Sequence, residues 1–297
     1  MRHQPVLLQE TLDLLNPQPG EVIVDGTVGY AGHAKLIAER LGPTGTFIGF
    51  DEDIDALTAS EEVLAEVSPR VFLINDNYRR LAEHLAERGI KTIDGLLLDL
   101  GLNSVQLESS GRGFSFQTDE PLLMTFRAED SHRQISARDI VNTWSENDLV
   151  NVIFGYGEEQ FAKKIARGIV NGRQTAPIET TGQLTAIISA AVPSWYKRRK
   201  IHPATKTFQA LRIAVNDELP ALKQGLAAGW SLLNTGGRLV VITFHSLEAG
   251  PVKDFFRARK KEGRGELINK KVIKPGRSAI KENPRSRSAQ IRGLRKI

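Results

Sequence analysis

The chain has 297 residues, 40% hydrophobic and 25% charged, with a net charge of +5, values typical of a water-soluble globular protein with one or two domains. The absence of cysteine excludes disulfides and thiolate chemistry and fits a reducing compartment, so we expect a cytoplasmic protein. No apolar run approaches the roughly 18 residues of a membrane span, and no paired histidine spacing indicates a metal site. Neither membrane contact nor a bound metal is therefore expected.

Short apolar runs alternate with helical patterns over the first hundred residues. The opening stretch MRHQPVLLQETLDLL is predicted to be a structured amphipathic segment and lacks the features of a signal or transit peptide. A helical segment follows each predicted strand, and the strands lie at residues 21–25, 46–51, 70–75 and 94–100. Nearly continuous apolar strands are expected where helices cover both faces of a parallel sheet.

The alternation stops at residue 101. Residues 101–215 contain short amphipathic helical segments and almost nothing strand-like, which indicates a helical insertion. The earlier pattern then returns with a helix and further strands, which we predict at residues 238–244, 269–274 and 290–297. We therefore expect a discontinuous α/β domain at residues 1–100 and 216–297, interrupted by a helical domain at residues 101–215.

The positive charge is concentrated at the end of the chain. Residues 251–297 carry 16 Lys and Arg against 4 Asp and Glu, whereas the first 250 residues carry a net charge of −7. Such a tail is either a solvated, partly disordered end or a surface that contacts nucleic-acid phosphates. A second basic cluster at Lys197, Arg198, Arg199 and Lys200 favours the nucleic-acid interpretation.

A glycine-rich turn follows the first predicted strand, within EVIVDGTVGYAGHAKLIAE. Its glycines let the backbone approach a ligand, and the next helix directs free N–H groups at the same place. Asp25 and Asp51 end the first two strands, where an acid commonly binds ribose hydroxyls, so an adenosine-containing cofactor is indicated. The GxxGxxG spacing departs from the GxGxxG of dinucleotide sites. The residues alone leave open S-adenosylmethionine (SAM), the cofactor of an NAD-type oxidoreductase, or a purely structural turn.

Five stretches in the same order resemble the ribosomal RNA small-subunit methyltransferase H family: HQPVLLQETLDLL, DGTVGYAGHA, LLLDLGLNSVQLESSGRGFSF, HPATKTFQALRIAVNDEL and ITFHSLE. The resemblance covers essentially the whole chain. It implies a class I (Rossmann-like) SAM-dependent methyltransferase fold with an inserted helical domain for substrate recognition. The implied activity is methylation of the exocyclic N4 of a cytidine in the decoding region of small-subunit (16S) ribosomal RNA. The implied partner is that RNA within an assembled or assembling small subunit, and a homodimer is also expected.

The resemblance also implies the residues that contact SAM, which are Ala31, Gly32, His33, Asp51, Tyr78, Asp99 and Gln106. Two of them have a competing structural interpretation. His33 would otherwise be a surface residue at the start of a helix, and Tyr78 would otherwise belong to the core. Gln106 is singled out by the resemblance alone.

Asp99 and Asn103 are the candidate catalytic residues. Many amino-methyltransferases place an (Asp/Asn)-Pro-Pro-(Tyr/Phe) box after the fourth strand, and here this position reads Asp99-Leu-Gly-Leu-Asn103 without prolines. The site must accept hydrogen bonds from the target amine, which both side chains can do. The candidate substrate-binding residues are His202, Arg212, His245 and Ser246, for which interdomain packing and loop structure are the alternatives.

Several positions depart from the usual family pattern. Tyr30 and Ala31 replace glycines of the turn, and further departures lie at Asn103, Glu108, Gln117, Leu123, Thr125 and Ala249. The cofactor side is altered mildly and the substrate side more strongly. A family member that binds RNA with an altered target or lost activity is therefore the alternative function.

Overall fold

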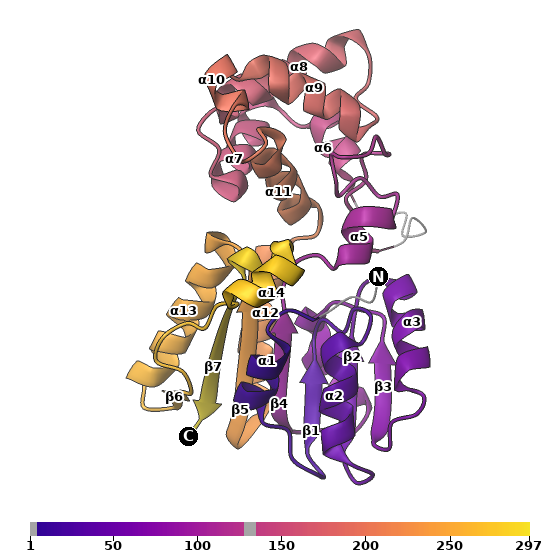
Figure 1. Cartoon of the computed structure of the whole chain (residues 1–297), viewed down its shortest axis with the longest axis vertical. Helices are drawn as coiled ribbons and strands as arrows, with labels where there is room; N and C mark the ends of the chain where they lie inside the picture. Colours follow the sequence, from indigo (N-terminus) through magenta and orange to yellow (C-terminus); the bar gives the residue numbers. More distant parts are fainter. Residues whose placement is uncertain (1–4, 128–134) are drawn as a thin grey trace. The chain divides into compact units, whose positions relative to one another are not determined.

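The structure is a computed structural model that describes residues 5–127 and 135–297. The chain divides into two compact units (Figure 1). Unit 1 comprises Met1–Gly101 and Leu219–Ile297, and unit 2 comprises Leu102–Glu218. These limits lie close to the predicted boundaries at 101 and 216, and the role of each unit as a functional domain stays a prediction.

Unit 1 contains a seven-stranded sheet with the order β3-β2-β1-β4-β5-β7-β6 over the described ranges. Strands β1 to β5 are parallel, whereas β7 is antiparallel to both β5 and β6. The strands are β1 Val22–Asp25, β2 Thr46–Phe50, β3 Arg70–Ile74, β4 Ile93–Asp99, β5 Leu233–Thr243, β6 Gly265–Leu267 and β7 Gln290–Lys296. The four predicted early strands are confirmed to within one residue at each end.

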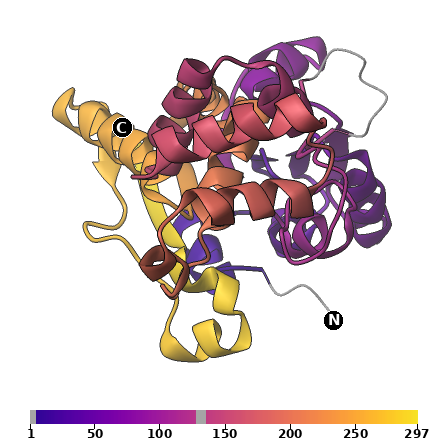
Figure 2. The ribbon, with the colours of Figure 1, turned by 90° about the horizontal axis from the view of Figure 1, so that it is seen from above.

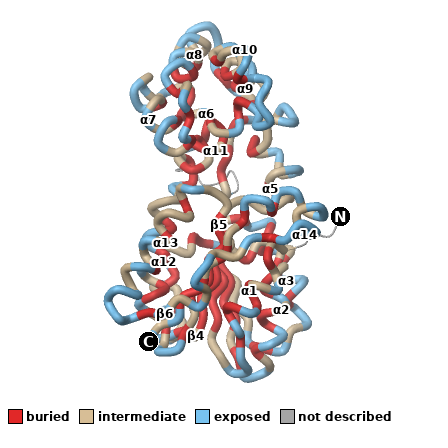
Figure 3. Tube along the Cα trace, turned by 60° about the vertical axis from the view of Figure 1, so that its left-hand side comes forward, coloured by how far each residue is buried: buried red, intermediate tan, exposed pale blue. Residues whose placement is uncertain are grey.

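Helices cover both faces of this sheet because neighbouring side chains of each strand enter different cores. Leu96 and Leu98 pack into one core with helices α4, α12 and α13, whereas Leu97 packs into the other with α1, α2 and α3. Figure 3 shows the buried strands in red. The helices of unit 1 are α1 Leu8–Leu15, α2 Gly32–Leu41, α3 Ile54–Leu64, α4 Leu81–Glu87, α13 Ser246–Lys261 and α14 Arg277–Glu282, with the short η1 Tyr78–Arg80 and η2 Pro284–Ser288. Helix α12, Glu218–Leu232, begins at the last residue of unit 2.

Two strand predictions in the C-terminal part need correction. Residues 269–274 are not a strand, because the Asn269 side chain takes up the edge of β7: it accepts from Gly293 N–H at 2.7 Å and donates to Ile291 C=O at 3.1 Å. A single bridge between Ile273 and Ile291 remains. Strand β5 begins at Leu233, before the predicted residue 238, and its register against β4 shifts between Ile93 and Gly95.

The basic tail is folded. Residues 251–297 form most of α13 together with β6, α14, η2 and β7, so the interpretation as a partly disordered end is wrong. Strand β7 pairs with β5 along its length and contributes Ile291 and Leu294 to the two cores. The positive charges of the tail are therefore held on a defined surface of unit 1.

Unit 2 is helical and has its own core. Its helices are α5 Ser104–Ser109, α6 Ala137–Thr143, α7 Glu146–Gly157, α8 Ala162–Thr175, α9 Thr181–Ala191, α10 Ser194–Lys197 and α11 Ala204–Val215. Helix α8 packs beside α7 and α9, and these helices appear in pink and red in Figure 2. Within this core the Tyr196 hydroxyl donates to the fully buried Glu159 at 2.6 Å. Among the described residues, no helix is long and apolar enough to cross a membrane.

Candidate active site

Three aspartates lie at the carboxyl ends of adjacent strands. Asp25 is the last residue of β1, Asp99 is the last residue of β4, and Asp51 directly follows β2. Strand β1 lies between β2 and β4, so the three carboxylates come to the same edge of the sheet. The strand order changes direction between β1 and β4, which is where open α/β sheets bind ligands.

Thr27 links two of these aspartates. Its backbone N–H and its hydroxyl donate to Asp25 Oδ1 at 2.9 and 3.3 Å, and its hydroxyl accepts from the backbone N–H of Asp99 at 2.7 Å. Asp25 is only 1% exposed, and this burial raises its pKa to about 7 despite the bonds from Thr27. Thr27 is not among the predicted site residues, although an Asp followed two residues later by a donor is a signal of an Asx turn.

Asp51 connects the glycine turn to β2. Its two carboxylate oxygens accept from the backbone N–H groups of Gly29 at 2.8 Å and Asp53 at 2.9 Å. Burial raises the pKa of Asp51 to about 6, and these two hydrogen bonds oppose the rise. Each oxygen keeps a second lone pair, so the carboxylate can also accept hydrogen bonds from a diol.

Two glycines of the turn have little room for a side chain. A Cβ at Gly26 would lie 2.5 Å from Leu98 Cδ2 and 3.0 Å from Tyr78 Cβ, so a larger residue there would displace a neighbouring side chain. Ala31 adopts the left-handed conformation at φ 61°, which costs a non-glycine residue about 1 kcal/mol. Its methyl group is 1% exposed and packs into the core with α2. Gly32, the first residue of α2, would meet Pro5 if it carried a Cβ.

His33 is an internal residue, so the interpretation as a surface histidine is wrong. It is 6% exposed, its Nε2 lies 3.1 Å from the Val6 carbonyl oxygen, and its Nδ1 lies 3.6 Å from Asp99 Oδ2. A carbonyl oxygen only accepts, so Nε2 carries the proton that it donates to Val6. His33 therefore bonds to the N-terminal segment and lies beside Asp99.

Asp99 also has a perturbed carboxylate. Burial raises its pKa well above the ordinary value, and the charges of Asp25 and Glu248 raise it further. Its Oδ1 is buried, and no group in residues 5–127 or 135–297 hydrogen-bonds to it. A buried polar atom without a partner is rare unless a ligand completes it. At this edge of the sheet, the Asp51 carboxylate is thus suited to a diol and the Asp99 carboxylate to a cationic or amine group.

Tyr78 borders the same turn. Its ring packs against α12, where a Cβ at Gly225 would come within 2.4 Å of Tyr78 Cδ2, and its Cβ lies beside Gly26. The residue is half-buried and contacts the core of that face. It is therefore both a packing residue and a neighbour of the glycine turn.

Asn103 and Gln106 belong to unit 2 and form the capping box of α5. Asn103 Oδ1 accepts from Gln106 N–H at 2.8 Å, and Gln106 Oε1 accepts from Asn103 N–H at 3.2 Å. This reciprocal arrangement satisfies two backbone donors at the start of the helix. Both side chains thus have a structural role, and their assignments to catalysis and cofactor binding stay predictions.

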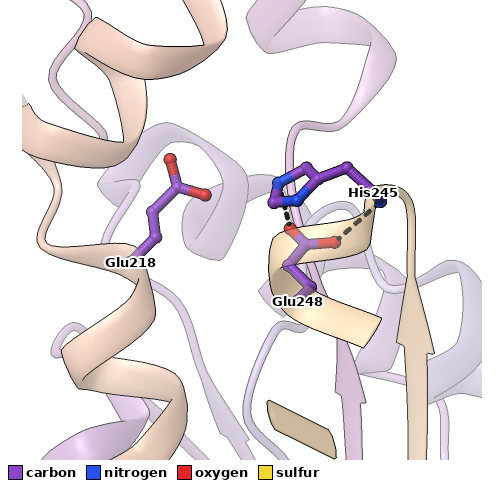
Figure 4. Close-up of side chains that lie close together, drawn as sticks. All are labelled: Glu218, His245 and Glu248. Atoms are coloured by element: carbon purple, nitrogen blue, oxygen red, sulfur yellow. Dashed lines mark hydrogen bonds and ion pairs between the residues drawn. The ribbon is translucent and has the colours of Figure 1, made fainter. Parts of the chain in front are cut away.

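His245 and Ser246 lie at the start of α13, directly after β5. His245 Nε2 is 3.0 Å from Glu248 Oε1, and Glu248 Oε2 accepts from the backbone N–H groups of Phe244 and His245 (Figure 4). Glu248 is 2% exposed, so this pair anchors the helix start from within, while Ser246 is exposed. The sequence also places Glu248 in this candidate group, and its position three residues after the cap is a capping-box signal.

His202 and Arg212 lie in unit 2 on and before α11. The His202 ring stacks on Phe116 with centroids 4.6 Å apart, and its Nδ1 accepts from Ala204 N–H. Arg212 Nε and Nη2 donate to Glu218 at 2.7 and 2.8 Å, and both side chains are largely buried. The guanidinium of Arg212 is thus already committed to a carboxylate, and its contact with substrate stays a prediction.

The strand order with an antiparallel β7, the glycine turn and the acidic carboxyl edge define a Rossmann-like SAM-dependent methyltransferase. A family model described as the MraW methylase family matches residues 1–297, and the chain belongs to this family. SAM is its cofactor, which excludes the NAD-type oxidoreductase.

The comparisons with individual proteins cover the full length. Relatives from Geotalea daltonii and Syntrophotalea carbinolica, both named ribosomal RNA small subunit methyltransferase H, are 48% and 44% identical. Each alignment covers 100% of this chain, with 99% and 98% of the respective relative. A solved structure from Clostridium thermocellum, described as a candidate rRNA methylase, covers 100% of both chains with a TM-score of 0.50 and 13% identity. This last similarity supports the fold alone.

Proposed function

We propose that this protein transfers a methyl group from SAM to the exocyclic N4 of a cytidine in the decoding region of small-subunit (16S) ribosomal RNA. The names of its full-length relatives support the RNA substrate. The observation that carries the chemistry is Asp99, a carboxylate with an unpartnered buried oxygen at the end of β4. The substrate would be the RNA of an assembled or assembling small subunit, and the protein would act in the cytoplasm, as a monomer or homodimer.

Asp99 suits a reaction at an amine. The cytosine N4 lone pair is delocalised into the ring, so a hydrogen-bond acceptor must favour the more tetrahedral, more nucleophilic nitrogen. The Asp99 carboxylate would accept an N4–H bond and then the proton that the amine loses, a transfer that its raised pKa assists. Bound SAM supplies the electrophilic methyl group. His33 Nδ1 would attract this carboxylate when the imidazole is protonated at both nitrogens.

The remaining residues of the carboxyl edge would bind and orient the cofactor. Asp51 would accept from the ribose hydroxyls while it holds Gly29, and the turn from Ala31 to His33 would lie along the ligand. Tyr78, next to Gly26, would pack beside the adenine. Methyl transfer is an in-line displacement, so this positioning supplies much of the catalysis.

Unit 2 carries a surface that suits single-stranded RNA. Trp195 is 51% exposed, and the Arg199 guanidinium lies 5.7 Å from its ring centroid. Lys197, Arg198 and Lys200 beside them are exposed. Exposed aromatic rings interleaved with cations stack bases and contact phosphates in single-stranded nucleic-acid sites. A target cytidine in a loop would be reached directly, whereas a paired one would have to be flipped out.

The activity itself is tested by mass spectrometry of modified cytidines in small-subunit ribosomal RNA, with and without the gene for this protein. We expect N4-methylcytidine at one position to disappear in its absence and to return when purified protein and SAM are added. RNA binding without any SAM-dependent change in cytidine mass would instead support the alternative of an RNA-binding family member that has lost its activity.

Replacing Asp51 with alanine is expected to weaken SAM binding about 10- to 150-fold, the loss of one charge-assisted hydrogen bond. Calorimetric titration of SAM measures the effect. Asp51→Asn keeps an acceptor for Gly29 N–H and separates the ribose contact from support of the turn. Asp55→Ala on the exposed start of α3 is the control with the same charge change. Unchanged affinity in a folded Asp51→Ala protein would remove the ribose assignment.

A further inference from the structure

Unit 1 contains a pocket that neither the proposed cofactor contacts nor the target cytidine accounts for. Residues of α13, β6, the segment 269–272 and β7 line it, and its volume is about 520 Å³. Figure 1 labels α13, β6 and β7. Five cations line it: Lys253, Arg257, Lys270, Lys271 and Arg292. We name it the C-terminal basic pocket.

The charge of this pocket is not neutralised by the protein. Within residues 5–127 and 135–297, no carboxylate lines the pocket and none of the five cations forms an ion pair or a side-chain hydrogen bond. Other cations of the tail behave differently, since Arg259 and Arg264 pair with Glu262 and Arg295 pairs with Glu266. The pocket therefore gathers five of the tail's unpaired cations at one place.

Arg292 gives the strongest sign of a missing anion. It stands on β7 with its Nε buried, and among the described residues this N–H has no acceptor. Burial lowers the pKa of Arg292, and the charge of Arg257 lowers it further, so two like charges face each other at a partly desolvated place. An anion with several acceptor oxygens would relieve both costs.

The backbone around the pocket is held in place before any ligand arrives. Asn269 donates to Lys271 C=O at 2.9 Å and accepts from Gly293 N–H at 2.7 Å, which fixes the segment 269–272 against β7. Phe256, 1% exposed, forms an apolar wall on α13. The five cations differ in exposure. Lys253 and Arg292 are half-buried, whereas Arg257, Lys270 and Lys271 are exposed and form the rim of the pocket.

We propose that the C-terminal basic pocket binds a backbone phosphodiester of the RNA substrate and so anchors the RNA on unit 1. The inference rests on the proposed RNA substrate and adds a specific site to it. The volume of the pocket falls in the range of ligand-binding sites and admits a phosphate with its attached sugar. The exposed rim would attract the strand, and Lys253 with Arg292 would hold one phosphate group.

The test compares two double variants with equal charge change. The pocket variant combines Lys253→Gln with Arg292→Gln, and the control combines Lys261→Gln with Arg277→Gln, two exposed tail cations outside the pocket. Affinity for a single-stranded fragment of the ribosomal RNA is measured across a potassium chloride series. We expect the pocket variant to bind about 10-fold more weakly than the control and to lose about one unit more of the salt slope. Its SAM affinity, and its turnover at saturating RNA, should match the control.

Equal RNA affinity and equal salt slope in the two variants would overturn the proposal, because the tail would then act only as diffuse charge. Inorganic phosphate, titrated at constant ionic strength, provides the second arm. Phosphate could stabilise the parent protein but not the pocket variant while the pocket and control variants bind RNA equally well. The pocket would then bind a free anion and not the RNA, and this result would also overturn the proposal. If the pocket variant loses SAM binding through misfolding, Lys270→Gln with Lys271→Gln at the exposed rim replaces it. Absence of RNA methylation by the parent protein would contradict the proposed function, whereas methylation with equal RNA binding by both variants contradicts the pocket alone.

Discussion

Replacing Asp99 with alanine is expected to slow methyl transfer about 10²- to 10³-fold, the cost of removing one acceptor aimed at the reacting group. SAM affinity should fall by a smaller factor. The reason is that Asp99 Oδ1 is buried without a partner among the described residues, which leaves it available to the amine that reacts. The measurement is the single-turnover rate with saturating SAM and RNA, set beside the dissociation constant of SAM.

The design of this experiment separates catalysis from folding. Asp99 has a strongly raised pKa, so its charged form destabilises the free protein and its removal should not unfold unit 1. Asp99→Asn keeps the size and one acceptor oxygen and should fall between the parent and Asp99→Ala. Asp94→Asn is the matched control at the other end of β4, where Asp94 accepts from Val22 N–H at 2.9 Å. A near-normal single-turnover rate for Asp99→Ala would show that another group accepts the amine.

The sheet could be predicted because its signal is local and strong. Strand β4 reads as an unbroken apolar run because Leu96 and Leu98 enter one core and Leu97 the other. An aspartate then ends the run, and the same pattern marks the end of β1. Such runs are short and bounded by polar residues or glycine, which separates them from helices.

The C-terminal edge could not be predicted in the same way. Strand β6 has only three residues and no apolar alternation, whereas the segment 269–274 has the composition of a strand. The side chain of Asn269, paired with β7 across 24 residues of sequence, decides the outcome. A long-range hydrogen bond of this kind produces no periodic pattern of apolar and polar residues from which it could be predicted.

The candidate site likewise combines residues that the sequence predicts with contacts that only the fold reveals. The aspartates of the carboxyl edge follow from where strands end, but the partners of those aspartates do not. His33 reaches the carbonyl of Val6 across 27 residues, and Arg212 is held by Glu218, contacts that only the fold reveals. The spacing of Asn103 and Gln106, in contrast, is that of a capping box, a local signal that competes with their assignment to chemistry.

Asp25 is expected to make the stability of the cofactor-free protein depend on pH. Burial raises its pKa from 3.8 to about 7, so between these values the folded chain holds a proton that the unfolded chain has lost. For an acid with a raised pKa, the stabilisation is complete below the unfolded value and is lost as the pH rises through the folded value. Acidification from pH 7 to pH 5 should therefore stabilise the folded state by about 2 kcal/mol through Asp25, and the raised pKa of Asp51 acts in the same direction.

The variant Asp25→Asn isolates this contribution, because its side-chain oxygen can still accept from the N–H and hydroxyl of Thr27. Urea unfolding of the cofactor-free protein at pH 5, 6, 7 and 8 should show a smaller gain on acidification in the variant, which should be the more stable protein at pH 8. Asp55→Asn, on the exposed start of α3, should leave the parent profile unchanged. Parallel profiles for Asp25→Asn and the parent would mean that Asp25 is ionised throughout.

SAM adds a second readout, since its net positive charge favours the ionised aspartates. Its stabilising effect should grow with pH in the parent and grow less in Asp25→Asn.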